Sequence, residues 1–206
     1  MIDHIFNRNG LFVLKAINKP VTYQYLQQLP SDKSKYLCLY KRFYRLRNYI
    51  SNDTREINRY VDTLRWKFTR EDFNKRLAMI DQSPLNNDDM FERFINTLSF
   101  VNNATVALPE NIPEKPINFI QDVKKPQRME RSIIKTILDM QLSKPDDIKY
   151  DTSYKWFKET EELYENFPEE ISKKNFKSTL SKIGIIGFHN YELNLMMLNN
   201  SYNLML

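Results

Sequence analysis

The chain has 206 residues, a net charge of +5 and a single cysteine, Cys38. One cysteine excludes an internal disulfide framework and a zinc site built from cysteines, and no stretch reaches the roughly 18 consecutive apolar residues of a membrane-spanning helix. With three glycines and few alternating β-branched runs, the sequence favours an all-α protein over a sheet-rich fold or a glycine-rich phosphate loop.

Positive charge is concentrated in one part of the chain. Residues 33–76 hold thirteen Lys or Arg and five Asp or Glu, a local balance of +8, so the other residues sum to −3. The charge is therefore predicted to form a patch on one module.

Residues 1–33 are predicted to be an N-terminal segment. Arg8, Lys15 and Lys19 are opposed only by Asp3 in the first 20 residues, and apolar residues lie between them. This composition resembles a weak mitochondrial presequence, although Asp3 and the absence of serine count against it. The alternative is an ordinary buried first helix.

The first helix is predicted from about residue 34 to residue 51, because apolar residues recur there at spacings of three and four. These apolar residues are Tyr36, Leu39, Tyr40, Phe43, Leu46 and Ile50. The basic residues Lys41, Arg42 and Arg45 fall largely on other faces. The stretch is therefore predicted to be an amphipathic helix with a basic side.

Two further helices complete a predicted module over residues 34–103. Asp53 followed by Glu56 forms a capping-box pattern that starts the second helix, and its apolar stripe can be followed as far as Ile80. The third helix is predicted over residues 88–102, after the turn-forming sequence SPLNNDD. The short loops favour an antiparallel three-helix bundle.

Residues 104–126 are predicted to be a linker, because they contain four prolines and little periodicity. Residues 127–206 return to helical patterns. Helices are expected over 127–144, 152–167 and 168–183, followed by a tail rich in Leu, Met and Asn. This tail is expected to close the core, since methionine packs adaptably; the alternative is a partner-binding helix.

Sequence motifs for catalysis are not found. His4 and His189 are far apart and show no metal-ligand spacing, and Cys38 lies in the basic helix without an activating signature. Walker, GxSxG and GxGxxG motifs are absent from the sequence. The chain is therefore expected to be non-enzymatic and to bind no metal or cofactor of its own.

The stretch YLCLYKRFYRLRNYISN, residues 36–52, combines four Lys or Arg residues and five aromatic rings with no acidic residue. Its Leu39, Tyr40 and Lys41 resemble the signature of the LYR-motif superfamily, small mitochondrial three-helix proteins that also carry a Phe late in the second helix. Phe68 holds that place here. Lys41 stands where the family has arginine, so a planar bidentate contact would become a point-charge contact.

The same region also resembles the fungal increased recombination centres family, also described as required for respiratory growth. The likeness comprises Tyr40 to Phe43, Arg45-Leu46, Ile50-Ser51-Asn52, and Tyr60 with Lys67-Phe68. It covers roughly residues 34–80. The resemblance implies a mitochondrial protein that maintains the mitochondrial genome, respiratory competence and sporulation; a nuclear or cytoplasmic location is the alternative.

The LYR likeness implies a partner, the mitochondrial acyl carrier protein or another acidic protein. Partner-binding residues would be Leu39, Tyr40, Lys41, Arg42, Arg45 and Phe68, with the cationic side chains meeting carboxylates. Phe43 and Leu64 would line a tunnel for the acyl chain that is linked to the carrier through pantetheine. Such a chain would bury apolar surface in the bundle.

The alternative is direct binding of nucleic acid or the mitochondrial ribosome by the same helix. Lys and Arg would contact phosphates and aromatic rings would stack on bases. Because Tyr36, Tyr40 and Phe43 lie on the apolar stripe, only Tyr44 and Tyr49 are credible stacking residues. A purely structural basic face is the third possibility.

Overall fold

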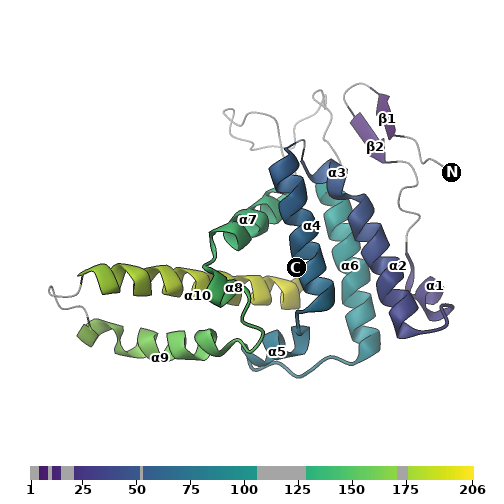
Figure 1. Ribbon diagram of the computed structural model, residues 1–206. Coiled ribbons are helices and arrows are strands. Elements are labelled where there is room, and N and C mark those ends of the chain that lie inside the picture. The colour runs from purple at the N-terminus through teal and green to yellow at the C-terminus, as the bar shows by residue number, and fades with distance from the viewer. Residues whose placement is uncertain (1–4, 9–10, 15–20, 52, 106–128, 171–175) are drawn as a thin grey trace, which may run out of the picture.

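The computed structural model describes residues 5–8, 11–14, 21–51, 53–105, 129–170 and 176–206, and most of them are helical (Figure 1). This confirms the predicted all-α class. The described strands are β1 (Ile5–Arg8) and β2 (Leu11–Leu14), an antiparallel pair with Ile5 opposite Leu14. A buried first helix is therefore wrong for these residues, where Asn-Gly, the dipeptide typical of two-residue hairpin turns, separates two apolar runs.

The first predicted helix is interrupted. After α1 (Tyr23–Gln27), α2 (Asp32–Arg45) starts at the N-cap Ser31, and α3 (Arg47–Ile50) follows. The single helix predicted over 34–51 breaks at the buried Leu46, whose backbone N–H donates to the Phe43 carbonyl at 3.0 Å. This bond, between residues three positions apart, tightens the last turn of α2. Arg47 Nη1 donates to the Tyr44 carbonyl at 3.0 Å. These carbonyl groups at the end of α2 therefore have hydrogen-bond donors although the helix does not continue.

The second and third helices begin close to their predicted starts. Asp53 caps α4 (Thr54–Thr69) by accepting from the backbone N–H of Arg55 at 2.8 Å. The continuation of this helix to Ile80 is wrong, because α5 (Phe73–Ala78) starts anew at its own N-cap, Asp72. The third helix, α6 (Asn87–Thr105), confirms the prediction and is a few residues longer.

Helices α2, α4 and α6 lie side by side and form the centre of the molecule (Figure 1). Their facing surfaces are apolar, and the Tyr60 hydroxyl donates to the Phe43 carbonyl at 2.9 Å inside this core. Burial raises the pKa of Tyr60, so it stays protonated as a donor. The predicted linker lies outside the described residues except for Ala104 and Thr105, which end α6.

The C-terminal region packs onto this centre. It comprises α7 (Met129–Ser143), α8 (Asp146–Lys149), α9 (Lys155–Glu170) and α10 (Phe176–Tyr202). Helix α7 contacts α4 and α6, while α9 runs alongside α10 (Figure 1). The separate helix and tail predicted after residue 168 are wrong, since one helix spans Phe176–Tyr202. None of the helices in the described part of the chain is long and apolar enough to cross a membrane.

The end of the chain closes the core, as predicted. Leu204, Met205 and Leu206 are buried. Asn199, which is fully buried, holds this end from both sides: its Nδ2 donates to the Leu206 carbonyl at 3.1 Å and its Oδ1 accepts from the Leu206 N–H at 2.7 Å. The Met205 N–H donates to Thr97 on α6 at 2.7 Å. These bonds fix the tail against the bundle.

Candidate functional site

A buried cluster of charges joins the two halves of the chain. Glu192 on α10 accepts from Arg76 at 3.0 Å and contacts Lys144, and Glu71 contacts both Arg76 and Lys67. Sequence analysis did not find this cluster, because Lys144 and Glu192 lie far along the chain from the stretch 67–76 that holds its other members. The paired charges satisfy one another inside the protein, so their role is to hold α10 against α4 and α5.

Electrostatic coupling sets the protonation of this cluster. Burial on its own would raise the pKa of Glu192, but the adjacent Arg76 and Lys144 lower it to about 2. Burial lowers the pKa of Lys144, partly offset by Glu192. At neutral pH the carboxylate is therefore ionised and paired.

The predicted partner-binding residues of α2 divide between the core and the surface. Leu39 is fully buried and Phe43 is nearly so. Lys41 and Arg45 are exposed, and Arg42 is half-buried and engaged in an interaction. Of the three cations, Lys41 and Arg45 are the most accessible to a partner, while Leu39 serves the core of the chain itself.

Tyr40 and Phe68, two of the predicted partner-binding residues, lie next to each other. Their ring centroids lie 5.5 Å apart in an edge-to-face arrangement. Both line an open groove of about 650 Å³ between α2 and α4, which we call the α2 groove. Its other apolar lining residues are Tyr36, Leu37, Phe73, Met90, Phe94 and Met205. The groove adjoins the helix that carries Lys41 and Arg45.

Phe43 and Leu64 also meet, around an apolar cavity of about 60 Å³ in the core. Phe68, Met205 and Leu206 line the same cavity. An apolar cavity of roughly 150 Å³ is large enough to bind benzene. An acyl chain of about ten methylenes would therefore need residues that line this space to move, and Met205 and Leu206 at the end of the chain are among them.

The predicted stacking residues, Tyr44 of α2 and Tyr49 of α3, are poorly placed for bases. Tyr44 is half-buried, its ring centroid lies 6.0 Å from that of Tyr40, and the Arg47 guanidinium lies 4.0 Å from the centroid of the Tyr44 ring. Tyr49 is also half-buried. The basic-aromatic pattern of α2 is therefore largely used for contacts within the protein.

His189 and Cys38 take structural positions. His189 is buried on α10, with its ring centroid 4.0 Å from that of Phe157 on α9, in a stacked arrangement. Cys38 is half-buried and packs against the core of the bundle. Both side chains contribute to packing between helices.

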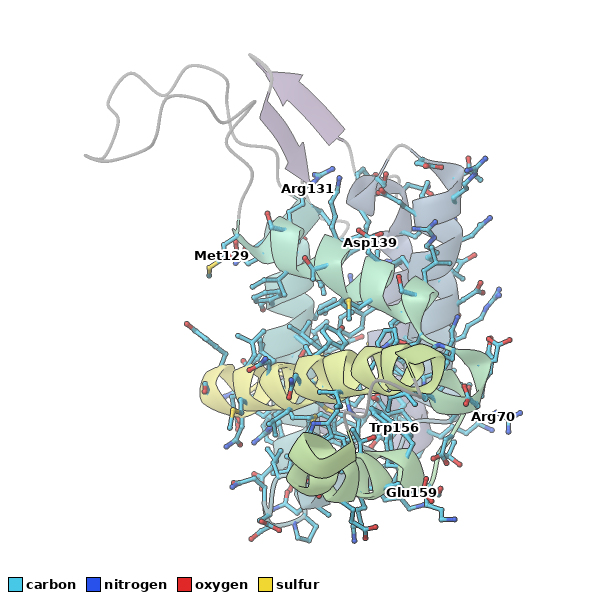
Figure 2. All side chains as sticks on the ribbon, turned by 90° about the vertical axis from the view of Figure 1, so that its left-hand side faces the viewer. Arg70, Met129, Arg131, Asp139, Trp156 and Glu159 are labelled. Atoms are coloured by element: carbon cyan, nitrogen blue, oxygen red, sulfur yellow. The ribbon has the colours of Figure 1, made fainter. Side chains whose placement is uncertain are left out.

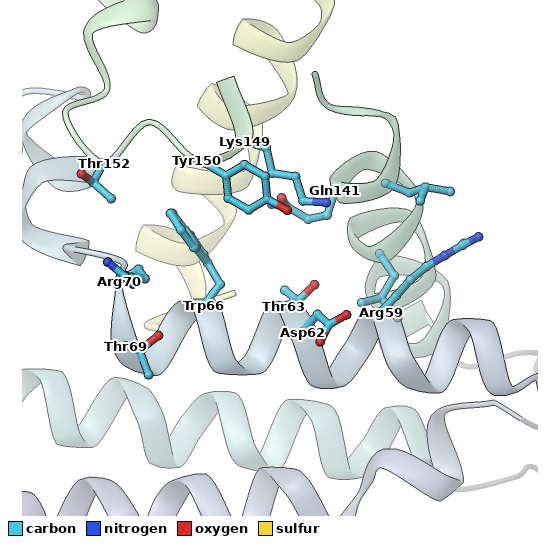
Figure 3. A pocket seen from close by; sticks show the side chains of 12 residues that line it. Arg59, Asp62, Thr63, Trp66, Thr69, Arg70, Gln141, Lys149, Tyr150 and Thr152 are labelled. Carbon is cyan, nitrogen blue, oxygen red and sulfur yellow. The ribbon is translucent and has the colours of Figure 1, made fainter. Parts of the chain in front are cut away.

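Another hollow lies on the other side of α4, between α4, α7 and α8, and has a volume of about 730 Å³ (Figure 3). We call it the Trp66 groove. Trp66 rises from α4 toward Tyr150, which follows α8, and the two ring centroids lie 5.7 Å apart at an interplanar angle of 67°. Tyr150 is 57% exposed. The groove thus presents aromatic surface to solvent.

Basic side chains border the Trp66 groove. Arg59, Arg70 and Lys149 line it, against one carboxylate, Asp62. Arg70 projects at the edge of the molecule (Figure 2). Sequence analysis missed this site, although Trp66 stands in a basic stretch, because Tyr150 and Lys149 reach it only through the packing of α7 on α4.

Comparisons with known proteins point to one family. The model of the family "Increased recombination centres protein 19" matches residues 12–206. Similar curated proteins are the increased recombination centers protein 19 of Komagataella phaffii, 33% identical over 106 residues, and that of Candida glabrata, 34% identical over 105 residues. These alignments cover 51% of this chain and 52% and 47% of the relatives, so the chain spans about half the length of the curated relatives it matches. No solved structure matches the chain.

Proposed function

The chain belongs to the increased recombination centres protein 19 family, and from this membership we propose that it is a non-enzymatic factor that maintains genome integrity. The family name, with its reference to recombination, supports the general role. The resemblance of residues 34–80 supports the more specific part of the proposal, which is maintenance of the mitochondrial genome, respiratory competence and sporulation. The location would then be mitochondrial.

The proposed mechanism is docking of an acidic partner protein along α2. The observation that carries it is the exposure of Lys41 and Arg45 on α2, the helix whose Tyr40 lines the α2 groove together with Phe68 of α4. Exposed cations steer an acidic partner and set its orientation, while an adjoining apolar groove supplies area to bury. Because Leu39 and Phe43 anchor α2 in the core, the helix offers a fixed surface.

An acyl carrier protein fits the charge requirement, since its recognition surface is acidic. With Met205 and Leu206 in place, the cavity next to Phe43 and Leu64 has only about 60 Å³. We therefore expect the carrier to dock through charge contacts on α2, and its acyl chain to enter only if residues that line the cavity move. Another protein with an acidic helix could bind to the same surface of α2.

The test is affinity purification of the tagged full chain from its own cells, after nuclease treatment, followed by intact-mass analysis of the proteins that co-purify. The variant Lys41→Glu/Arg45→Glu should lose an acidic partner. The matched control, Arg55→Glu/Lys158→Glu, makes the same change of net charge at exposed positions elsewhere and should retain it. Equal recovery with both folded variants would contradict docking on α2.

A further inference from the structure

Among the residues that the structure describes, none fills the hollow beside the aromatic surface of the Trp66 groove. Trp66 and Tyr150 meet edge to face rather than face to face, at 67°, and the more exposed ring is that of Tyr150. Isolated exposed aromatic side chains are common on proteins, but these two line a single hollow of about 730 Å³. Its size falls within the range of ligand-binding clefts, roughly 300–1,000 Å³.

The charges around these rings favour an anionic ligand. Arg59, Arg70 and Lys149 outnumber Asp62 among the charged residues that line the groove. Asp62 is within 3.4 Å of Arg65, which reduces its effect on an incoming anion. Within the described part of the chain, Arg70 and Lys149 have no carboxylate within ion-pair distance. Arg70 is therefore available to an anion, and the Lys149 Nζ lies 5.5 Å from the centroid of the Tyr150 ring, so an anion bound by Lys149 would lie beside that ring.

Arg59 is the exception, because it pairs with Asp139 of α7 at 3.4 Å. The side chain of Asp139 is 69% exposed. Exposed pairs of this kind contribute little stability, so a phosphate could replace Asp139 as the partner of Arg59. Arg59 lies at the end of the groove away from Arg70 (Figure 3).

From this arrangement of rings and cations we propose that the Trp66 groove binds a single strand of nucleic acid. Phosphates contact Arg70, Lys149 and Arg59, and a base stacks on the exposed ring of Tyr150, with Trp66 beside it. Unpaired bases are required, because the faces of paired bases inside a duplex are occupied by their neighbours. Ring stacking and phosphate contacts are both tolerant of sequence, so we expect little sequence preference.

This site is separate from the α2 groove, on which the proposed docking of an acidic protein depends. The two grooves lie on opposite sides of α4 and share Thr69 as a lining residue. Lys41 and Arg45 do not line the Trp66 groove. Loss of either activity by mutation is therefore expected to leave the other in place.

The first experiment measures binding of the full chain to a fluorescein-labelled oligothymidylate of about 15 nucleotides, the upper part of the site sizes seen for single-strand binding folds. Fluorescence anisotropy is recorded over a range of salt concentrations. Arg70→Gln/Lys149→Gln should weaken binding and reduce the slope of log K against log salt by about 0.7 for each phosphate that the protein no longer neutralises. Arg55→Gln/Lys158→Gln has the same net charge and should bind as the wild type does.

The aromatic contribution is tested at Tyr150, which is exposed and can be replaced without disturbing the core. Tyr150→Phe keeps the ring and should retain the affinity. Tyr150→Leu keeps apolar bulk without the ring and should weaken binding on the order of tenfold. The chain has two tryptophans, so in the variant Trp156→Phe all tryptophan fluorescence comes from Trp66. We expect this Trp66 fluorescence to be quenched when the strand binds.

Any one of the following results would overturn the proposal. The first is absence of binding by the wild-type chain at low salt. The second is equal affinity for the two double Gln variants. The third is equal affinity for Tyr150→Leu and Tyr150→Phe, or unchanged Trp66 emission while the anisotropy rises, since the strand would then lie elsewhere. The last is an affinity for a duplex of the same length that equals the affinity for the single strand.

Discussion

Glu192 of α10 lies 3.0 Å from the guanidinium of Arg76 on α5, although 116 positions separate the two residues in the chain. Both side chains are almost fully buried. Arg76 also donates to the Leu206 carbonyl at 3.3 Å, so the same guanidinium contacts both α10 and the end of the chain. This pair links the C-terminal region to the helices that form the two grooves.

Replacing Glu192 by Gln is expected to destabilise the protein strongly. The change leaves the buried Arg76 and Lys144 with one carboxylate fewer, and breaking a buried pair in this way costs about 3–5 kcal/mol. Urea denaturation followed by circular dichroism measures the free energy of unfolding. Glu159→Gln is the matched control, because Glu159 pairs with Lys155 on the surface and its loss should cost at most about 1 kcal/mol. Equal effects of the two variants would contradict the structural role of the cluster.

The contribution of Glu192 should depend on pH in the acid range. Its folded-state pKa is about 2, below the unfolded value of about 4.3, so folding favours the ionised form. The resulting stability, roughly 3 kcal/mol, is present above the unfolded pKa and is lost as the pH falls toward about 2. The difference in unfolding free energy between wild type and Glu192→Gln should therefore shrink between about pH 5 and pH 3. A difference that stays constant over this range would show that Glu192 titrates normally.

Asn199 is expected to hold the end of the chain in place. Asn199→Ala removes both bonds to the backbone of Leu206 and leaves a buried carbonyl and N–H without these partners, at a cost of about 1–3 kcal/mol for each unsatisfied group. Hydrogen exchange should show faster exchange at the N–H groups of Leu204–Leu206 while the α2 amides remain protected. Replacing the exposed neighbour Asn200 by Ala is a milder comparison, since it removes one hydrogen bond with Arg93. Unchanged exchange in Asn199→Ala would mean that apolar packing alone retains the tail.

Phe68 is expected to matter for folding as well as for any partner. Its ring contacts those of Tyr40, Phe43 and Phe94, with centroids between 5.0 and 5.9 Å apart. Phe68→Ala should therefore cost about 3–5 kcal/mol in unfolding free energy, whereas Lys41→Ala, at an exposed position, should stay within about 0.5 kcal/mol. Thermal or urea denaturation distinguishes the two. A small effect of Phe68→Ala would indicate that the α2 groove collapses to fill the space.

Much of the helical framework could be predicted from local sequence. The spacing of Leu39, Phe43 and Leu46 identified the buried side of α2, and Asp53 marked the start of α4, because amphipathic spacing and capping depend on neighbours within a few residues. The helix breaks at Leu46 and after Thr69 were missed, since the apolar pattern continues across them. The hairpin was missed because its short apolar runs are as compatible with a helix as with strands.

The sequence by itself therefore determined the all-α class, the helices of the central bundle, the exposure of Lys41 and Arg45, and the likeness to a family. Only the tertiary structure decided which distant residues meet. It placed Glu192 beside Arg76, the tail against the cavity of Phe43 and Leu64, and Tyr150 across from Trp66. The physical reason is that helix periodicity and capping are local, whereas ion pairs, cavities and grooves arise from packing between helices, which no local pattern encodes.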